Sequence, residues 1–253
     1  MSDGSVSVAG ALRAGVSDLG AAINACWAAL LIAVVLTVTA NFLPPAVRLL
    51  IVLVAGVIAQ GALFRRAFAR PSGVKGLRWG RDEWRLLGAH LMVLCLLVLI
   101  ASVLLVVIGA IALGVARVSS PNLDVGSAAA WKDALAHAGP AGVVAGVAPL
   151  AGLAILIWLS LRLAFTAPAT VAQSGVRVLS AFPMTKGRVP TLLVVSLALA
   201  SPVIVVTPLL GLIPASGVGA AAVTAVLTYI LLAPAWAGAL AHLYRHSAVS
   251  QDA

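Results

Sequence analysis

The side chains that could support acid–base or metal chemistry are few in this sequence and widely separated. The chain has 253 residues, of which seven are acidic and four are histidine. Asp82 and Glu83 are adjacent in an arginine-rich stretch, where pairing with neighbouring arginines is a simpler interpretation than a general-base role. His242 and His246 share a helix face because they are four residues apart, but no third ligand lies nearby. This inventory predicts no catalytic residue, no metal site and no cofactor, and therefore no enzyme.

Motifs of common catalytic and transport chemistry are also missing from the sequence. The chain has neither a G-x-x-x-x-G-K-[ST] phosphate loop nor a G-x-S-x-G nucleophile elbow. Ion-coupled transporters usually carry ionisable residues deep in the membrane, whereas Arg48 and Arg162 fall near the ends of apolar runs. One pattern favours transport: Pro149, Pro202 and Pro234 lie inside apolar runs, where bent helices could together line a cavity. The alternative is that these prolines are simply tolerated, as in many membrane helices.

Basic residues are the best candidates for binding. Sixteen lysines and arginines give the chain a formal net charge of +9. Most of them cluster in two loops between apolar runs, which is typical of a membrane topology signal and not of a nucleic-acid-binding face. We therefore expect no nucleic-acid partner. The residues predicted to contact anionic lipid headgroups, or a membrane protein partner, are Arg78, Arg81, Arg85, Arg177 and Lys186.

The apolar content of the chain indicates that it is embedded in a membrane. Hydrophobic residues make up 62% of the sequence and charged residues 9%, and the mean hydropathy is +1.15. A soluble domain carries about 25% charged residues, and a span needs about 20 apolar residues. We predict an all-α polytopic membrane helix bundle in which residues 1–253 form a single integral membrane domain. The expected spans are 22–40, 46–64, 88–115, 141–165, 191–213 and 218–243.

The loop charges also predict the orientation of the chain. With six spans, thirteen of the sixteen basic residues fall on one side, and only Arg48, Arg117 and Lys132 fall on the other. The positive-inside rule then places both termini in the cytoplasm. Termini on the same side require an even number of spans, and six satisfies this requirement. The composition, rich in arginine, alanine, valine and leucine, favours a GC-rich bacterial genome. We therefore expect a multi-pass protein of the bacterial inner membrane.

Both basic loops have apolar residues at helical spacing. In the second loop the pattern covers residues 171–182, with Arg177 on the polar side. In the first loop, Leu77, Trp84 and Leu87 share one face beside several arginines. Both segments are predicted to be amphipathic helices that lie in the cytoplasmic interface, attracted by anionic lipid. The alternative is that both loops are solvated linkers whose basic residues only set the orientation of the chain in the membrane.

The motif R-x-A-F-x-x-P occurs twice, at residues 65–71 and 162–168, each time at the end of a predicted span. Placement of both copies on one side would indicate a parallel internal repeat. In each copy the arginine would snorkel to the interface, the phenylalanine would anchor there and the proline would stop the helix. Any helix that ends at this interface can converge on the same residues, so both interpretations stay open.

Two loop segments carry short motifs of aromatic, basic and glycine residues. One is Gly-Leu-Arg-Trp-Gly-Arg-Asp-Glu-Trp-Arg-Leu-Leu-Gly at 76–88, and the other runs from Trp158 to the Met-Thr-Lys-Gly-Arg of 184–188. Together they resemble the loops of uncharacterised alphaproteobacterial multi-pass membrane proteins, which are similar to the membrane domain fused to some glycerophosphodiester phosphodiesterases. Those proteins usually have tryptophans where this chain has Phe182 and Val189. The resemblance implies a six-helix membrane fold and no known activity, because the phosphodiesterase domain is a separate soluble unit.

The predicted function follows from the basic loops and the lack of catalytic groups. We expect a non-enzymatic integral membrane protein with an accessory or scaffold role in the inner membrane. Its basic cytoplasmic loops would contact anionic lipid or a protein. The alternative function is a transporter or channel for a neutral or lipidic solute, built on the proline-containing second half of the chain.

Overall fold

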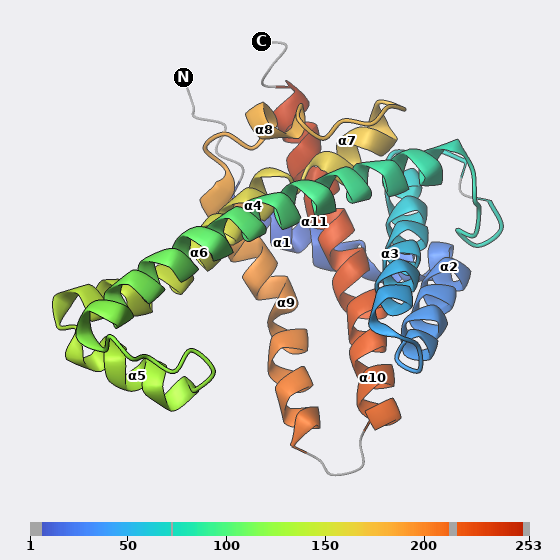
Figure 1. The fold of residues 1–253 in the computed structure, drawn as a ribbon. Helices are drawn as coiled ribbons and strands as arrows, with labels where there is room; N and C mark the ends of the chain where they lie inside the picture. Colours follow the sequence, from blue (N-terminus) through green and yellow to red (C-terminus); the bar gives the residue numbers. More distant parts are fainter. Residues whose placement is uncertain (1–6, 72, 213–216, 250–253) are drawn as a thin grey trace. The chain divides into compact units, whose positions relative to one another are not determined.

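The structure, a computed structural model, describes residues 7–71, 73–212 and 217–249 and consists of helices joined by turns (Figure 1). In these residues no strand forms beyond one isolated bridge between Val74 and Leu77. The all-α prediction is confirmed. The helices are α1 (Val8–Ser17), α2 (Leu19–Ala40), α3 (Pro45–Ala67), α4 (Arg81–Ser119), α5 (Ala128–His137), α6 (Pro140–Arg162), α7 (Thr166–Ala172), α8 (Ala181–Met184), α9 (Val189–Gly211), α10 (Gly217–Val226), the π-helix η1 (Leu227–Leu232) and α11 (Ala233–Val249).

Within the described residues, six helical segments are long and apolar enough to cross a membrane, and they overlap all six predicted spans. The chain is therefore a multi-pass membrane protein. The third segment differs most, because α4 begins at Arg81, where the Glu83 carboxylate accepts a hydrogen bond of 2.8 Å from the N–H of Gly80 and caps the helix. With 39 residues, α4 is about 60 Å long, about twice the thickness of the hydrocarbon layer.

The chain divides into two compact units. The larger unit contains Met1–Met92 and Leu161–Ala253, and the smaller unit contains Val93–Ser160. Helices α4 and α6 each contribute residues to both units. The prediction of a single membrane domain over the whole chain stays a prediction.

An antiparallel pair of helices, α2 and α3, packs closely in the larger unit. Their shared surface is rich in fully buried alanines, which let the two backbones approach each other. Helix α2 is kinked at Cys26, where φ is −120° and ψ is 15°. Gly76, in the loop after α3, fills the space beside this kink. A Cβ at Gly76 would lie 2.9 Å from the Cα of Cys26, and φ of Gly76 is +81°, so this position requires glycine.

The segment before the first span forms a helix, α1, that the sequence patterns did not predict. Ser7 caps this helix by accepting a hydrogen bond of 3.0 Å from the N–H of Gly10. Helix α1 packs against α11 at a crossing of small residues. A Cβ at Gly15 would lie 2.5 Å from the carbonyl oxygen of Ala235, and Gly238 of α11 faces Gly15. Because the crossing is so close, α1 forms part of the larger unit's core instead of a free N-terminal tail.

The last span contains a π-helical turn. Helix α10 continues into η1 (Leu227–Leu232) and then into α11, and Pro234 lies at the second position of α11. Pro234 has no N–H to donate to the carbonyl of Ile230, and in a regular α-helix its ring would collide with that carbonyl. A wider π-turn just before the proline relieves this conflict. Helix α9 also contains interior prolines, at 202 and 208.

The smaller unit consists of the second part of α4, α5 and most of α6. Ser127 caps α5 by accepting a hydrogen bond of 3.2 Å from the N–H of Ala130. Ser119 donates a hydrogen bond of 2.7 Å to the carbonyl of Ala134 and so ties α5 to the end of α4. Apolar side chains of α4 project outward, and Leu105 is 74% exposed. Such exposure is suited to lipid and not to water.

The second basic loop does not form the predicted amphipathic helix, and the first forms it only from Arg81 onward, where Trp84 and Leu87 lie in α4. Helix α7 ends at Ala172, and Ser174, with φ of +53°, turns the chain out of the helical path expected over 171–182. In the first loop, Leu77 is bridged to Val74 across a tight turn at Lys75 and Gly76, both of which have positive φ. Periodicity failed here because it ignores the cost of serine and glycine in a helix interior.

The two R-x-A-F-x-x-P segments end in the same part of the larger unit. The rings of Phe68 and Phe165 both meet Tyr244 edge-on, with centroid distances of 5.8 Å and 6.1 Å. The prolines differ, because Pro71 follows the end of α3, whereas Pro168 lies inside α7. The expectation that proline stops the helix is therefore correct for the first copy and wrong for the second. The internal duplication itself stays a prediction.

Candidate functional site

The span ends that carry most of the positive charge meet at one end of the larger unit, here called the basic end. Arg66, at the end of span two, makes two hydrogen bonds of 2.5 Å and 2.8 Å with Asp18, just before span one. Arg70 donates to Ser174 at 2.6 Å and to the carbonyl of Ala172 at 2.7 Å, which joins the two basic loops. Further hydrogen bonds at this end are Gln173–Tyr244 (3.0 Å), Thr185–Arg162 (3.0 Å) and Arg188–Ser247 (2.6 Å).

A buried ion pair positions the first basic loop. Arg65 of α3 and Glu83 of α4 form a salt bridge in which each side chain is only 1% exposed. Arg65 also donates a hydrogen bond of 3.1 Å to the carbonyl of Gly76. Gly61 makes room for the pair, because a Cβ there would lie 2.7 Å from Oε1 of Glu83. Arg65 therefore has a structural role, although the sequence analysis counted it only among the basic residues that set the orientation of the chain.

The expected pairing of the adjacent acidic residues is confirmed, but their partners differ in kind. Asp82 lies 3.6 Å from Arg85, one turn along the same helix, and both side chains are partly exposed. Glu83 instead pairs across two helices with the buried Arg65. Neither carboxylate is left as a free general base in the structure.

The structure places the five predicted binding residues on the surface of the basic end. Arg78 and Arg81 are exposed at the end of the first loop, and the neighbouring Arg85 is partly exposed and paired with Asp82. In the second loop, the side chains of Arg177 and Lys186 are exposed. Arg70, which the sequence did not single out, connects the two loops through Ser174 and Ala172.

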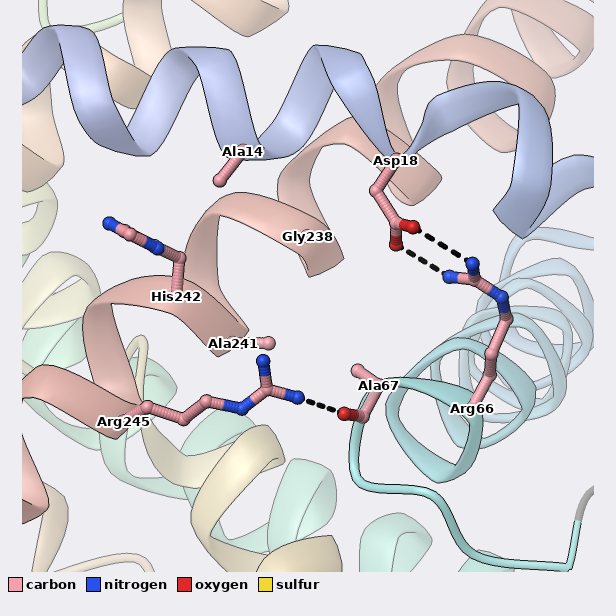
Figure 2. Close-up of a pocket in the computed structure, with 8 residues that line it drawn as sticks. All are labelled: Ala14, Asp18, Arg66, Ala67, Gly238, Ala241, His242 and Arg245. Carbon is pink, nitrogen blue, oxygen red and sulfur yellow. Dashed lines mark hydrogen bonds and ion pairs between the residues drawn. The ribbon is translucent and has the colours of Figure 1, made fainter.

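A pocket of about 420 Å³ opens between α1, α3 and α11 at the basic end (Figure 2). Arg66 and Asp18 pair on one wall, and Arg245 hydrogen-bonds to the carbonyl oxygen of Ala67. His242 lines the α11 side. The complete lining is Ala14, Asp18, Arg66, Ala67, Gly238, Ala241, His242 and Arg245.

The charges of this pocket favour an anion. Asp18 is the one carboxylate among the described lining residues, and Arg66 neutralises it through two hydrogen bonds, so that it no longer repels an anion. Arg245 is exposed, and its planar guanidinium has further donors beyond the one on Ala67. The ring of His242 adds a polar group at the rim. This arrangement can hold a phosphate or carboxylate group that approaches from the surface.

The rings of the two histidines of α11 lie against each other, with centroids 4.4 Å apart and an interplanar angle of 46°. No group of three histidine, cysteine or acidic side chains gathers in a metal-binding arrangement in the part of the chain that the structure describes. His242 contributes to the anion pocket, and His246 is exposed on the surface of α11.

Sequence patterns missed the pocket, although one signal could have found it. Asp18 begins span one and Arg66 ends span two, and the short connection between those spans makes them antiparallel neighbours. Residues at these two positions must lie at the same depth in the membrane, so their opposite charges predict an ion pair between them. The contribution of α11 has no comparable signal, because its contact with α1 joins segments more than 200 residues apart in the chain.

Comparison of this chain with protein-family models, curated proteins and solved structures finds no match. The resemblance of its loops to alphaproteobacterial membrane proteins therefore stays an expectation.

Proposed function

We propose that this chain is a non-enzymatic membrane protein whose basic end binds anionic lipid headgroups. In this proposal the protein lies in the bacterial inner membrane with the basic end and both termini in the cytoplasm. Its role would be accessory, holding anionic lipid, or a protein that shares this surface, at a fixed place on the membrane.

The observation that carries the proposal is the imbalance of charge at the basic end. Three carboxylates of the larger unit are described, Asp18, Asp82 and Glu83, and each is already paired with an arginine. The predicted topology assigns thirteen of the sixteen basic residues to this side, and among them Arg65, Arg66 and Arg85 are the ones paired with a described carboxylate of this unit. Each exposed lysine or arginine near an anionic leaflet contributes about 1 kcal/mol of attraction.

The pocket of Figure 2 supplies a specific place for one headgroup. Its position beside the end of α11 suits a lipid whose phosphate meets Arg245 while the acyl chains follow the helix toward the hydrocarbon layer. An arginine provides planar, two-pronged hydrogen bonds that match phosphate oxygens. The surface arginines would then concentrate anionic lipid, and the pocket would retain one molecule of it.

The test measures lipid preference around the reconstituted protein. Vesicles would contain phosphatidylcholine with a minor fraction of spin-labelled phosphatidylglycerol, and electron paramagnetic resonance would report the fraction of label held at the protein. We expect the preference for phosphatidylglycerol to fall in a variant with glutamine at the five predicted positions, and to fall further when Arg245→Gln is added. The lipid preference should also weaken in high salt, because exposed charges are screened.

A control removes two basic residues of the smaller unit, which the predicted topology places on the opposite side of the membrane. The variant Arg117→Gln/Lys132→Gln changes the net charge in the same direction but alters only the smaller unit. Its lipid preference should equal that of the unaltered protein. If the five-site variant keeps the full preference for phosphatidylglycerol, lipid binding by the basic end is wrong.

The alternative function, transport of a neutral or lipidic solute, is supported by a different observation. Span five contains interior prolines and span six contains a π-helical turn, and such features can free backbone groups to line a pathway. Proteoliposomes would be tested for flux, and Pro202→Ala and Pro234→Ala should each reduce it if this function is correct. Flux that both variants leave unchanged would remove this alternative.

A further inference from the structure

A second cavity, of about 440 Å³, lies at the end of the larger unit opposite the basic end. Asn41 ends α2 and Arg48 is near the start of α3, so these two residues mark the mouth. Thr207 of α9 lines one side, and Thr224 of α10 and Tyr229 of η1 lie along the last span. Its volume falls within the range of about 300–1,000 Å³ typical of small-molecule sites.

Arg48 brings an unbalanced positive charge to this cavity. In the described part of the chain, the Arg48 side chain has neither a hydrogen bond nor an ion pair, and all three carboxylates of the larger unit are held by other arginines. The side chain is exposed, so its five N–H donors are free to meet a ligand. A guanidinium at the mouth of a membrane cavity favours an anionic group over a neutral one.

Two of the polar side chains that line the cavity, Asn41 and Thr228, are hydrogen-bonded within their own helices. Thr228 donates a hydrogen bond of 2.8 Å to the carbonyl of Thr224. Asn41 donates to the carbonyl of Thr37 at 3.0 Å. The hydroxyl of Thr37 is buried without a hydrogen bond to any described residue, and much of the remaining lining consists of threonine methyl groups and small apolar residues such as Val52 and Ala225. This lining suits a hydrocarbon chain and gives little recognition to a polar solute.

The π-helical turn contributes two residues to the lining of the cavity. Thr228 and Tyr229 belong to η1, and Tyr229 is only 6% exposed. The wider turn that Pro234 imposes shapes the part of the last span that lines the cavity. Short π-helical segments often occur at functional sites, which agrees with a binding role for this one.

We propose that the cavity binds an amphipathic anion, with its charged head on Arg48 and its acyl chain in the space above Tyr229. The shared chemistry is that of a fatty acid and of an anionic phospholipid. This site is separate from the basic end, because it lies at the opposite ends of α2 and α3 and shares no lining residue with the pocket of Figure 2.

The test titrates the full-length protein, in phosphatidylcholine nanodiscs, with a fatty acid that carries a fluorescent chain. We expect saturable binding that Arg48→Gln weakens by about tenfold or more, because a hydrogen-bonded ion pair is lost. Arg48→Lys should retain most of the affinity, since it keeps the charge. Ala221→Leu, which adds bulk to a partly exposed lining position, should weaken binding without a change of charge.

Two controls separate this site from the rest of the protein. Arg117→Gln removes an exposed arginine of the smaller unit and should bind like the unaltered chain. Arg245→Gln impairs the basic end and should also leave this binding unchanged, so failure of one site does not imply failure of the other. Thermal unfolding of each variant confirms that it is folded, and the exposed position of Arg48 makes misfolding of its variants unexpected.

Competition identifies the source of the head group. Displacement by oleate alone supports a fatty-acid site, and displacement by phosphatidylglycerol supports a phospholipid site. Equal displacement by inorganic phosphate would overturn the proposal, because the acyl chain would then contribute nothing. Binding that is not saturable, or that Arg48→Gln and Ala221→Leu both leave at full strength, would overturn it as well.

Discussion

The buried pair of Arg65 and Glu83 gives the sharpest test of the structure. Glu83→Gln keeps the shape of the side chain but leaves the Arg65 guanidinium buried without its counter-charge. Both side chains are 1% exposed, so water cannot replace the lost partner. Breaking one partner of such a pair costs about 3–5 kcal/mol. We therefore expect the free energy of unfolding to fall by about that amount.

The adjacent residue provides a matched control. Asp82→Asn makes the same chemical change one position earlier, but its salt bridge to Arg85 spans 3.6 Å and both side chains are partly exposed. An exposed ion pair contributes about 1 kcal/mol or less. The two variants should therefore differ by at least about 2 kcal/mol, although they remove identical formal charge from neighbouring positions.

The assay is equilibrium unfolding in micelles that mix a mild detergent with sodium dodecyl sulfate, followed by circular dichroism. The double variant Arg65→Met/Glu83→Met should recover much of the stability that Glu83→Gln loses, because neither buried charge remains. If Glu83→Gln and Asp82→Asn destabilise the protein equally, the reasoning from burial is refuted. A double variant less stable than Glu83→Gln would refute it as well.

Three further predictions test packing and orientation. Gly15→Leu should push α1 away from α11, because even a Cβ there would lie 2.5 Å from the carbonyl oxygen of Ala235; thermal unfolding should show a loss of about 1–3 kcal/mol. Gly61→Ala should destabilise the protein by a similar amount in the same assay, because the added methyl meets the buried ion pair. In a cysteine-free background, a membrane-impermeant maleimide should label Arg81→Cys only from the cytoplasm and Arg48→Cys only from the periplasm. Labelling of both from one side would refute the proposed topology.

The spans could be predicted from the sequence because hydrocarbon imposes one simple requirement. Each span needs an uninterrupted apolar run, and every run in the sequence became a helix that overlaps its predicted bounds. Prolines at 44 and 45 and the glycine at 217 mark turns or helix starts, as local chemistry suggests. The sequence also predicts that the charged ends of the spans lie together. Consecutive spans run in opposite directions, so the end of one span and the start of the next-but-one fall on different sides, while the end of span two and the start of span one fall on the same side.

The loops could not be predicted in the same way, because their structure depends on contacts made elsewhere in the chain. Leu77 and its neighbours turn instead of forming a helix, since Gly76 has to fit against the kink at Cys26. Helix α1 is stable because α11 covers it through a glycine crossing, and no local pattern reveals that partner. Sequence periodicity detects a helix face that lipid or a protein core will bury, but it does not identify the distant segment of the chain that covers this face.

The distribution of carboxylates connects the fold to both proposed sites. Helices α3 and α4 bury one carboxylate to fix the first basic loop, and α1 presents another to hold Arg66 beside the pocket of Figure 2. The third carboxylate is paired to Arg85, so among the described residues of the larger unit no carboxylate is left for Arg48 or for the exposed arginines of the loops. Every described carboxylate of this unit therefore takes part in an ion pair that supports the fold. The positive charge that remains lies at both ends of the same helices, where the anionic groups of lipids are found, and this makes lipid a more consistent ligand than a neutral solute.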